Sequence, residues 1–195
     1  MFEIVDAIKA GDARQIVAQS LGLIAFLIAA LSFQSKTQRR IVCMQMIASF
    51  CFTVQYFILG VTCGCILNGI AFFRAFVYSF RSTHRWAASV IWLYVFSALI
   101  IVGGVYSAID GEGLPVIIAV VGSIIATVGY RMEKAGTVRT VTLIQSPLWL
   151  IYAFVSGSIG GALSELFSIC SIVIGKLRLD LKKHRGGLGS ESANF

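Results

Sequence analysis

Seven long apolar stretches are the feature of this sequence that most constrains its fold. They cover approximately residues 16–34, 41–59, 61–80, 87–109, 114–130, 140–156 and 158–175. A membrane-spanning helix needs about 20 predominantly apolar residues. Only 13% of the chain is charged, against about a quarter in soluble domains, so the polar residues are too few to cover a globular surface. The sequence therefore predicts an all-α integral membrane protein with seven transmembrane helices.

The basic residues gather on one side of the predicted membrane. Of the 16 lysines and arginines, 13 fall between alternate apolar stretches or in the C-terminal tail: Lys36, Arg39, Arg40, Arg81, Arg85, Arg131, Lys134, Arg139, Lys176, Arg178, Lys182, Lys183 and Arg185. Positive loops mark the cytoplasmic face, so we expect the N-terminus outside and the C-terminus in the cytoplasm. A six-span alternative, which merges or drops one stretch, would scramble this separation. The same charges predict contact with anionic membrane lipids, and no pattern typical of nucleic-acid binding is present.

A repeat relates the two halves of the chain. Residues 51–70, shifted by 97 positions, fall on 148–167 and place Phe57 on Phe154, Gly60 on Gly157 and Asn68 on Glu165. A helix between two three-helix units makes the units parallel, an arrangement found in transporters. The expected organisation is an interfacial segment at 1–15, a first bundle at 16–80, a linker helix at 87–109, a second bundle at 114–175 and a basic tail at 176–195.

The repeat pairs an amide with an acid inside the predicted membrane. Glu165 is the one carboxylate in the stretch "SGSIGGALSELFSICSIVIG" (156–175), and Asn68 holds the equivalent place in the first bundle. Ionisable groups inside a membrane face the protein interior and mark pathways more often than they face lipid. We therefore expect Asn68 and Glu165 to face each other across a central cavity. Structural hydrogen bonding between helices is the alternative explanation for both residues.

Other residues are weaker candidates for the same cavity. Gln145, Trp149 and Tyr152 are spaced for one helical face, and Phe52 stands on the second apolar stretch. Such walls suit a small polar ligand, although helix packing explains the same pattern. Pro147 predicts a kink in the sixth helix, which would be either a hinge or a static bend. Arg74 is interpreted as extending its charge towards the lipid headgroups, with a bound phosphate or carboxylate as the alternative.

The residues also resemble a known family. "LGLIAFLIAALSF" followed by "TQRR", then "FILG" and "ILNGIAFFR", and later "LPVI" and "GSIGG" are similar to the YgjV family of bacterial inner-membrane proteins. The resemblance covers roughly residues 20 to 178. It implies a bacterial inner-membrane location and a relation to the SWEET, SemiSWEET and PQ-loop transporters, hence a 3+1+3 arrangement of paired bundles. It also implies a substrate-contacting role for Asn68. The chain departs from that group by placing Glu165 where a second asparagine is expected, and by lacking the Pro-Gln pair.

These observations predict a small-molecule transporter rather than an enzyme. The two bundles would alternate access to a small polar metabolite, with coupling to a proton or cation through Glu165. No catalytic motif stands out, and we expect neither a metal nor a cofactor. The sequence does not identify the substrate, and it is compatible with either a monomer or an oligomer. The alternative is a membrane protein that keeps this fold but does not transport, such as a lipid-binding, assembly or sensory partner.

Overall fold

Every regular element in the computed structural model, which describes residues 13–113, 115–155 and 159–181, is helical. The long helices are α2 (Ala13–Ser32), α3 (Gln38–Leu59), α4 (Thr62–Ser79), α6 (Ile91–Ser107), α7 (Val116–Tyr130), α8 (Ala135–Val155) and α9 (Ile159–Gly175). Short pieces are α5 (Arg85–Ala88) and the π-helical turns η1 (Ala108–Glu112) and η2 (Lys176–Leu181). The predicted interfacial segment 1–15 and the end of the predicted tail lie largely outside the described residues.

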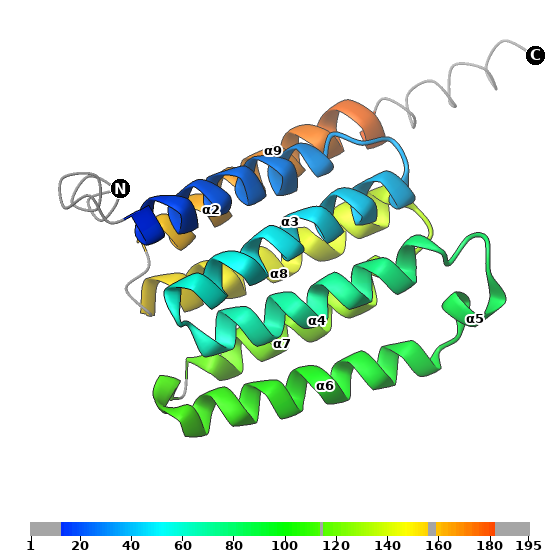
Figure 1. The fold of residues 1–195 in the computed structure, drawn as a ribbon. Helices are drawn as coiled ribbons and strands as arrows, with labels where there is room; N and C mark the ends of the chain where they lie inside the picture. The colour runs from blue at the N-terminus through cyan, green and yellow to red at the C-terminus, as the bar shows by residue number, and fades with distance from the viewer. Residues whose placement is uncertain (1–12, 114, 156–158, 182–195) are drawn as a thin grey trace, which may run out of the picture.

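The helices form two layers (Figure 1). In the first layer α3 lies between α2 and α4, and in the second α8 lies between α7 and α9. Across the layers α2 contacts α9, α3 contacts α8 and α4 contacts α7, while α6 lies along one edge against α4 and α7. Helices α2, α4, α7 and α9 run in one direction, and α3, α6 and α8 return.

Local sequence signals explain where several helices begin and end. The Thr37 hydroxyl accepts a hydrogen bond from the amide of Arg40 (3.4 Å) at the start of α3, as N-cap residues do. At the end of α3, Gly60 has a φ of 73°. This left-handed conformation suits glycine, and it makes the tight turn into α4.

Apolar side chains cover the outside of the helices. Large exposed residues occur on each long helix, for example Leu23, Phe50, Phe73, Val102, Ile117, Ile144 and Phe167. Four apolar helical segments of the described chain are long enough to cross a membrane, namely 13–32, 38–59, 62–79 and 91–111, and α7 is a shorter apolar helix. An extended apolar exterior of this kind suits lipid rather than water. The structure therefore supports the predicted multi-pass membrane class.

The repeat recurs in the contacts between the layers. Arg74 of α4 donates to the Thr127 hydroxyl of α7, and Ser171 of α9 donates to the carbonyl of Ala30 in α2. Residues 74 and 171, and residues 30 and 127, are each 97 positions apart. The α4–α7 and α9–α2 contacts are thus equivalent under the shift that aligns residues 51–70 with 148–167.

Candidate functional site between the two layers

Arg74 lies between the layers rather than at the lipid headgroups. Its side chain is 5% exposed, and Nη1 donates to the carbonyl of Ser123 (2.9 Å) and to the hydroxyl of Thr127 (2.8 Å). The guanidinium carbon stands 5.0 Å from the centre of the Tyr130 ring, within the range of a cation–π interaction. The interpretation of Arg74 as a residue reaching towards the headgroups is therefore wrong, because α7 provides acceptors within the protein.

The positive charge of Arg74 is stabilised by the carbonyl of Ser123, the hydroxyl of Thr127 and the ring of Tyr130. Within the described residues, no carboxylate makes an ion pair with it, and its Nε has no hydrogen-bond partner. A buried cation without a paired anion is costly, so such a group suggests a use beyond packing.

Glu165 approaches the same region from α9. The Ser146 hydroxyl of α8, whose residue is 1% exposed, donates a hydrogen bond to the Glu165 carboxyl group. The acid is also close enough to Tyr130 for the two side chains to interact electrostatically. Tyr130 thus has the Arg74 guanidinium on its ring and the Glu165 carboxyl group nearby. Tyr130 of α7 therefore interacts directly with Arg74 of α4 and, at longer range, with Glu165 of α9.

Asn68 does not share that region with Glu165. Its side-chain amide donates to the carbonyl of Gly64 (2.9 Å), one turn earlier in α4. Helix α4 packs against α3, α6 and α7, whereas α9 packs against α8 and α2, and α3 and α8 lie between them (Figure 1). The structure does not bring Asn68 and Glu165 together, because the two-layer packing puts α4 and α9 at opposite edges. The expected cavity between them stays a prediction.

The remaining predicted residues occupy separate places. Trp149 and Tyr152 of α8 contact each other edge to face, with ring centres 5.7 Å apart, and both pack against a buried cluster formed by Cys63, Leu67, Ile100, Val116 and Ala119. Phe52 stacks on Tyr56 within α3. The Gln145 side-chain oxygen is buried without a hydrogen-bond partner. Helix α8 continues through an exposed Pro147, and its role as a hinge stays a prediction.

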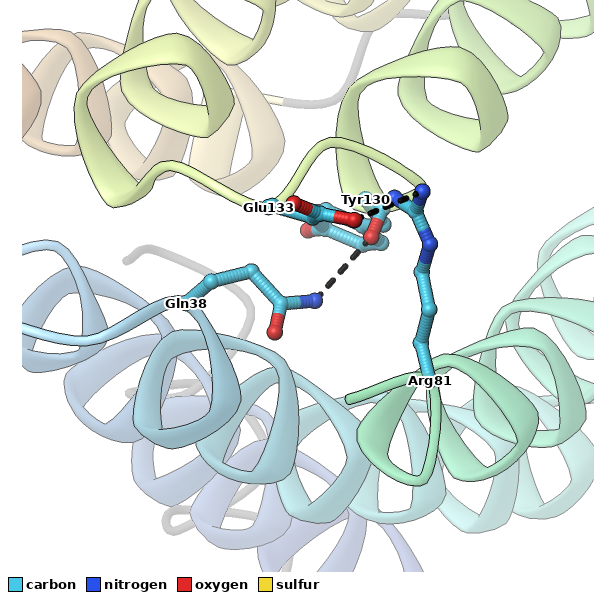
Figure 2. Close-up of polar contacts among 4 residues, drawn as sticks. All are labelled: Gln38, Arg81, Tyr130 and Glu133. Carbon is cyan, nitrogen blue, oxygen red and sulfur yellow. Dashed lines mark hydrogen bonds and ion pairs between the residues drawn. The ribbon is translucent and has the colours of Figure 1, made fainter. Parts of the chain in front are cut away.

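Polar contacts also join the layers at the basic end, where α4 and α7 end and α3 and α8 begin (Figure 2). Gln38 donates to the carbonyl of Tyr130 (3.1 Å), and Arg81 makes an ion pair with Glu133 (3.3 Å). Arg139 of α8, 1% exposed, donates to the carbonyls of Phe33 (2.8 Å) and Ser35 beyond the end of α2. The sequence places Arg139 in a cytoplasmic segment, but α8 begins at Ala135 and carries it into the interior.

The packed apolar helices and their apolar exterior define an integral membrane protein. The chain belongs to the YgjV family of bacterial inner-membrane proteins, since the model of that family, described as bacterial inner membrane protein, matches residues 16–183. It is similar to the inner membrane protein YgjV of Escherichia coli (strain K12), with 28% identity over 152 residues, 76% of each chain. No solved structure matches it. The predicted family and multi-pass inner-membrane location are confirmed, while the relation to the SWEET and PQ-loop proteins stays a prediction.

Proposed function

We propose that this protein is an inner-membrane transporter of a small polar metabolite. It would have seven spans in a 3+1+3 arrangement, with the N-terminus outside, and would work by relative movement of its two layers. The observation that carries the proposal is the duplicated pair of layers with a buried Arg74 at one interlayer contact. Among the residues that the structure describes, no carboxylate forms an ion pair with this arginine. Two parallel halves suit alternating access, because one half can rock against the other around a site that lies between them.

The polar groups between the layers divide naturally into two roles. Arg74 would attract a negatively charged or strongly polar part of the metabolite, since its Nε is free of hydrogen bonds within the described residues. Glu165, held by Ser146, would take up a proton or bind a cation during the cycle. Tyr130 contacts the Arg74 guanidinium with its ring and interacts electrostatically with the Glu165 carboxyl group. Further contacts of the metabolite, made in other conformations of the protein, stay predicted for Trp149, Tyr152, Phe52, Gln145 and Asn68.

Transport can be tested without knowing the metabolite. Purified protein is reconstituted into liposomes loaded with a bacterial metabolite extract, and the compounds released over time are identified by mass spectrometry. We expect at least one compound to leave only when the protein is present. Arg74→Met and Glu165→Gln should each lower the initial rate about tenfold or more, and Glu165→Gln should also remove any dependence on an imposed pH gradient.

Two exposed residues provide matched controls. Arg178→Gln and Asp110→Asn change the same charges at exposed positions in η2 and η1, and we expect wild-type rates from both. Release that is equal in wild type and in the double variant Arg74→Met/Glu165→Gln would contradict the site. If no compound leaves faster than it leaves loaded liposomes without protein, transport itself is contradicted.

That last outcome would favour the non-transporting alternative. Its support is the packing between the helices, where two clusters of buried apolar side chains lie. Two pockets of the described chain are at helix ends, one by Arg14 and Phe57 and the other by Arg81 and Lys134. A lipid-binding or assembly protein needs no internal passage, so this form of the molecule is compatible with it.

A further inference from the structure

A shallow pocket at the basic end differs from the Arg74 region in position and in chemistry. It is lined by Arg81, Arg131, Met132, Glu133, Lys134 and Thr137. Figure 2 shows Arg81 reaching from the end of α4 to Glu133, which follows α7, so the pocket lies where the two layers meet. Its volume is about 260 Å³, below the range of about 300 to 1,000 Å³ typical of whole-metabolite sites. A small charged group is the occupant that fits.

The charges around the pocket favour an anion. Arg81, Arg131 and Lys134 bring three positive charges, and Glu133 brings one negative charge. The Nε atoms of Arg81 and Arg131 are buried and have no hydrogen-bond partner within the described residues. Neither guanidinium group therefore has its hydrogen-bonding capacity filled, and arginine recognises tetrahedral oxyanions such as phosphate by several donors at once.

In the ion pair between Arg81 and Glu133, the carboxylate is the partner that a ligand can replace. The Arg81 side chain is 16% exposed, whereas the Glu133 side chain is 79% exposed. The cation is held by its surroundings, while the carboxylate stands mostly in solvent, where an ion pair contributes little to stability. A ligand with two negative oxygens could displace Glu133 from Arg81 at little cost and keep the arginine in place.

The start of α8 adds neutral donors. Helix α8 begins at Ala135, and Lys134 and Thr137 on either side of that point both line the pocket. The first-turn amides of an α-helix have no partner within the helix, and the helix dipole favours a negative group there. The Thr137 hydroxyl is a further donor. The side chains that line this small space therefore include a neutral donor, Thr137, beside the charged ones.

We propose that this pocket binds a phosphate group, carried by an anionic lipid headgroup or by a soluble phosphate. The phosphate oxygens contact Arg81, Arg131 and Lys134, and the Glu133 carboxylate moves into solvent. Because Arg81 belongs to the first layer and residues 131–137 to the second, the bound phosphate replaces the ion pair as a link between the layers. The proposal does not depend on transport.

The full-length protein in nanodiscs tests this proposal. In phosphatidylcholine nanodiscs at constant ionic strength, inorganic phosphate is titrated with chloride as the comparison ion, and binding is followed by thermal shift. In a second arm, native mass spectrometry counts the phosphatidylglycerol molecules retained from mixed nanodiscs. Phosphate binding that phosphatidylglycerol blocks assigns the site to the lipid headgroup. Phosphate binding that persists with phosphatidylglycerol assigns it to a soluble phosphate. Both results support the phosphate site, and binding in neither arm overturns it.

Charge variants locate the binding. Arg131→Gln and Lys134→Gln should each weaken it about tenfold, the loss expected for one hydrogen bond to a charged group. Arg178→Gln, which removes an exposed charge outside the pocket, should leave it unchanged. Glu133→Gln should strengthen it because the competing carboxylate is gone, and Arg131→Gln should cancel that gain. Equal losses from Arg131→Gln and Arg178→Gln, or weaker binding by Glu133→Gln, would overturn the proposal.

Discussion

At the scale of single residues, Arg74 distinguishes a structural role from a functional one. Burying its guanidinium carries a desolvation cost that no carboxylate offsets within the described residues. Its acceptors do not depend on it, because the Thr127 hydroxyl already donates to the Ser123 carbonyl (2.8 Å). Removing Arg74 therefore leaves no buried acceptor without a donor.

This gives a prediction about stability. Arg74→Met, which keeps a long flexible side chain, should leave the melting temperature of the detergent-solubilised protein unchanged or raise it, since replacing a buried charge by an apolar group is often neutral or stabilising. Size-exclusion fluorescence after heating measures this directly. A purely structural Arg74 would instead lower the melting temperature by several degrees, and that result would remove the reason to place it in a binding site.

The carboxyl group of Glu165 can be separated from its hydrogen bond in the same way. Glu165→Gln keeps a side-chain oxygen that can accept from Ser146, whereas Glu165→Leu removes the acceptor and leaves the buried hydroxyl unpaired. We expect Glu165→Gln to keep the wild-type melting temperature and Glu165→Leu to lower the free energy of unfolding by about 1 to 3 kcal/mol. Equal melting temperatures for the two variants would mean that the hydrogen bond is not formed.

At the scale of helices, the contact between α9 and α2 depends on a small residue. A Cβ atom on Gly175 would lie 2.5 Å from the carbonyl oxygen of Phe33 and 3.3 Å from Nε of Arg139. It would press on the hydrogen bond by which Arg139 meets the chain just beyond α2. Backbone atoms cannot move aside as a flexible side chain can.

Alanine substitutions at two helical glycines test this contact. Gly175→Ala should lower the free energy of unfolding by about 1 to 3 kcal/mol through overpacking. Gly69→Ala in α4 is the control, because its Cβ would meet nothing closer than 3.9 Å, and it should be neutral or stabilising by up to about 1 kcal/mol. Thermal unfolding in one detergent compares the two. If Gly175→Ala is as stable as Gly69→Ala, the close contact of α9 with the end of α2 is wrong.

The positions of the helices along the sequence could be predicted well. Which side chains of each helix face its neighbours could not. The first three stretches were expected at 16–34, 41–59 and 61–80, and α2, α3 and α4 cover 13–32, 38–59 and 62–79, because apolar length and residues such as Gly60 define the ends. A membrane helix is apolar on both its lipid-facing and its protein-facing sides. Periodicity therefore did not show that Arg74 faces α7, or that Asn68 and Glu165 lie apart. Contacts to main-chain carbonyls, such as Gln38 to Tyr130, have no sequence signal.

At the scale of the whole molecule, the separation of charge predicts one orientation in the membrane. The described basic residues Lys36, Arg81, Arg131 and Arg178 lie at or beyond the helix ends that share one end of the molecule, and the turn at Gly111 and Gly113 lies at the other (Figure 1). Alkaline phosphatase fused after Gly113 should therefore be active, and green fluorescent protein at the C-terminus should fluoresce. The opposite pair of results would reverse the proposed orientation. Alkaline phosphatase that is active both after Gly113 and at the C-terminus would contradict an odd number of spans between these two positions.

Helix α6 makes the two edges of the molecule unequal. Its adjacent residues Gly103 and Gly104 are pressed against Ile66 of α4 and Val120 of α7, respectively, so a single helix touches both layers along that border. Helices α2 and α9 meet at the other border with no equivalent of α6 beside them in the described chain. A separation of the layers is consequently restrained on one flank by a helix that both layers share, and on the other only by the direct contacts of α2 with α9. The molecule would therefore part sideways, towards the surrounding acyl chains, between α2 and α9.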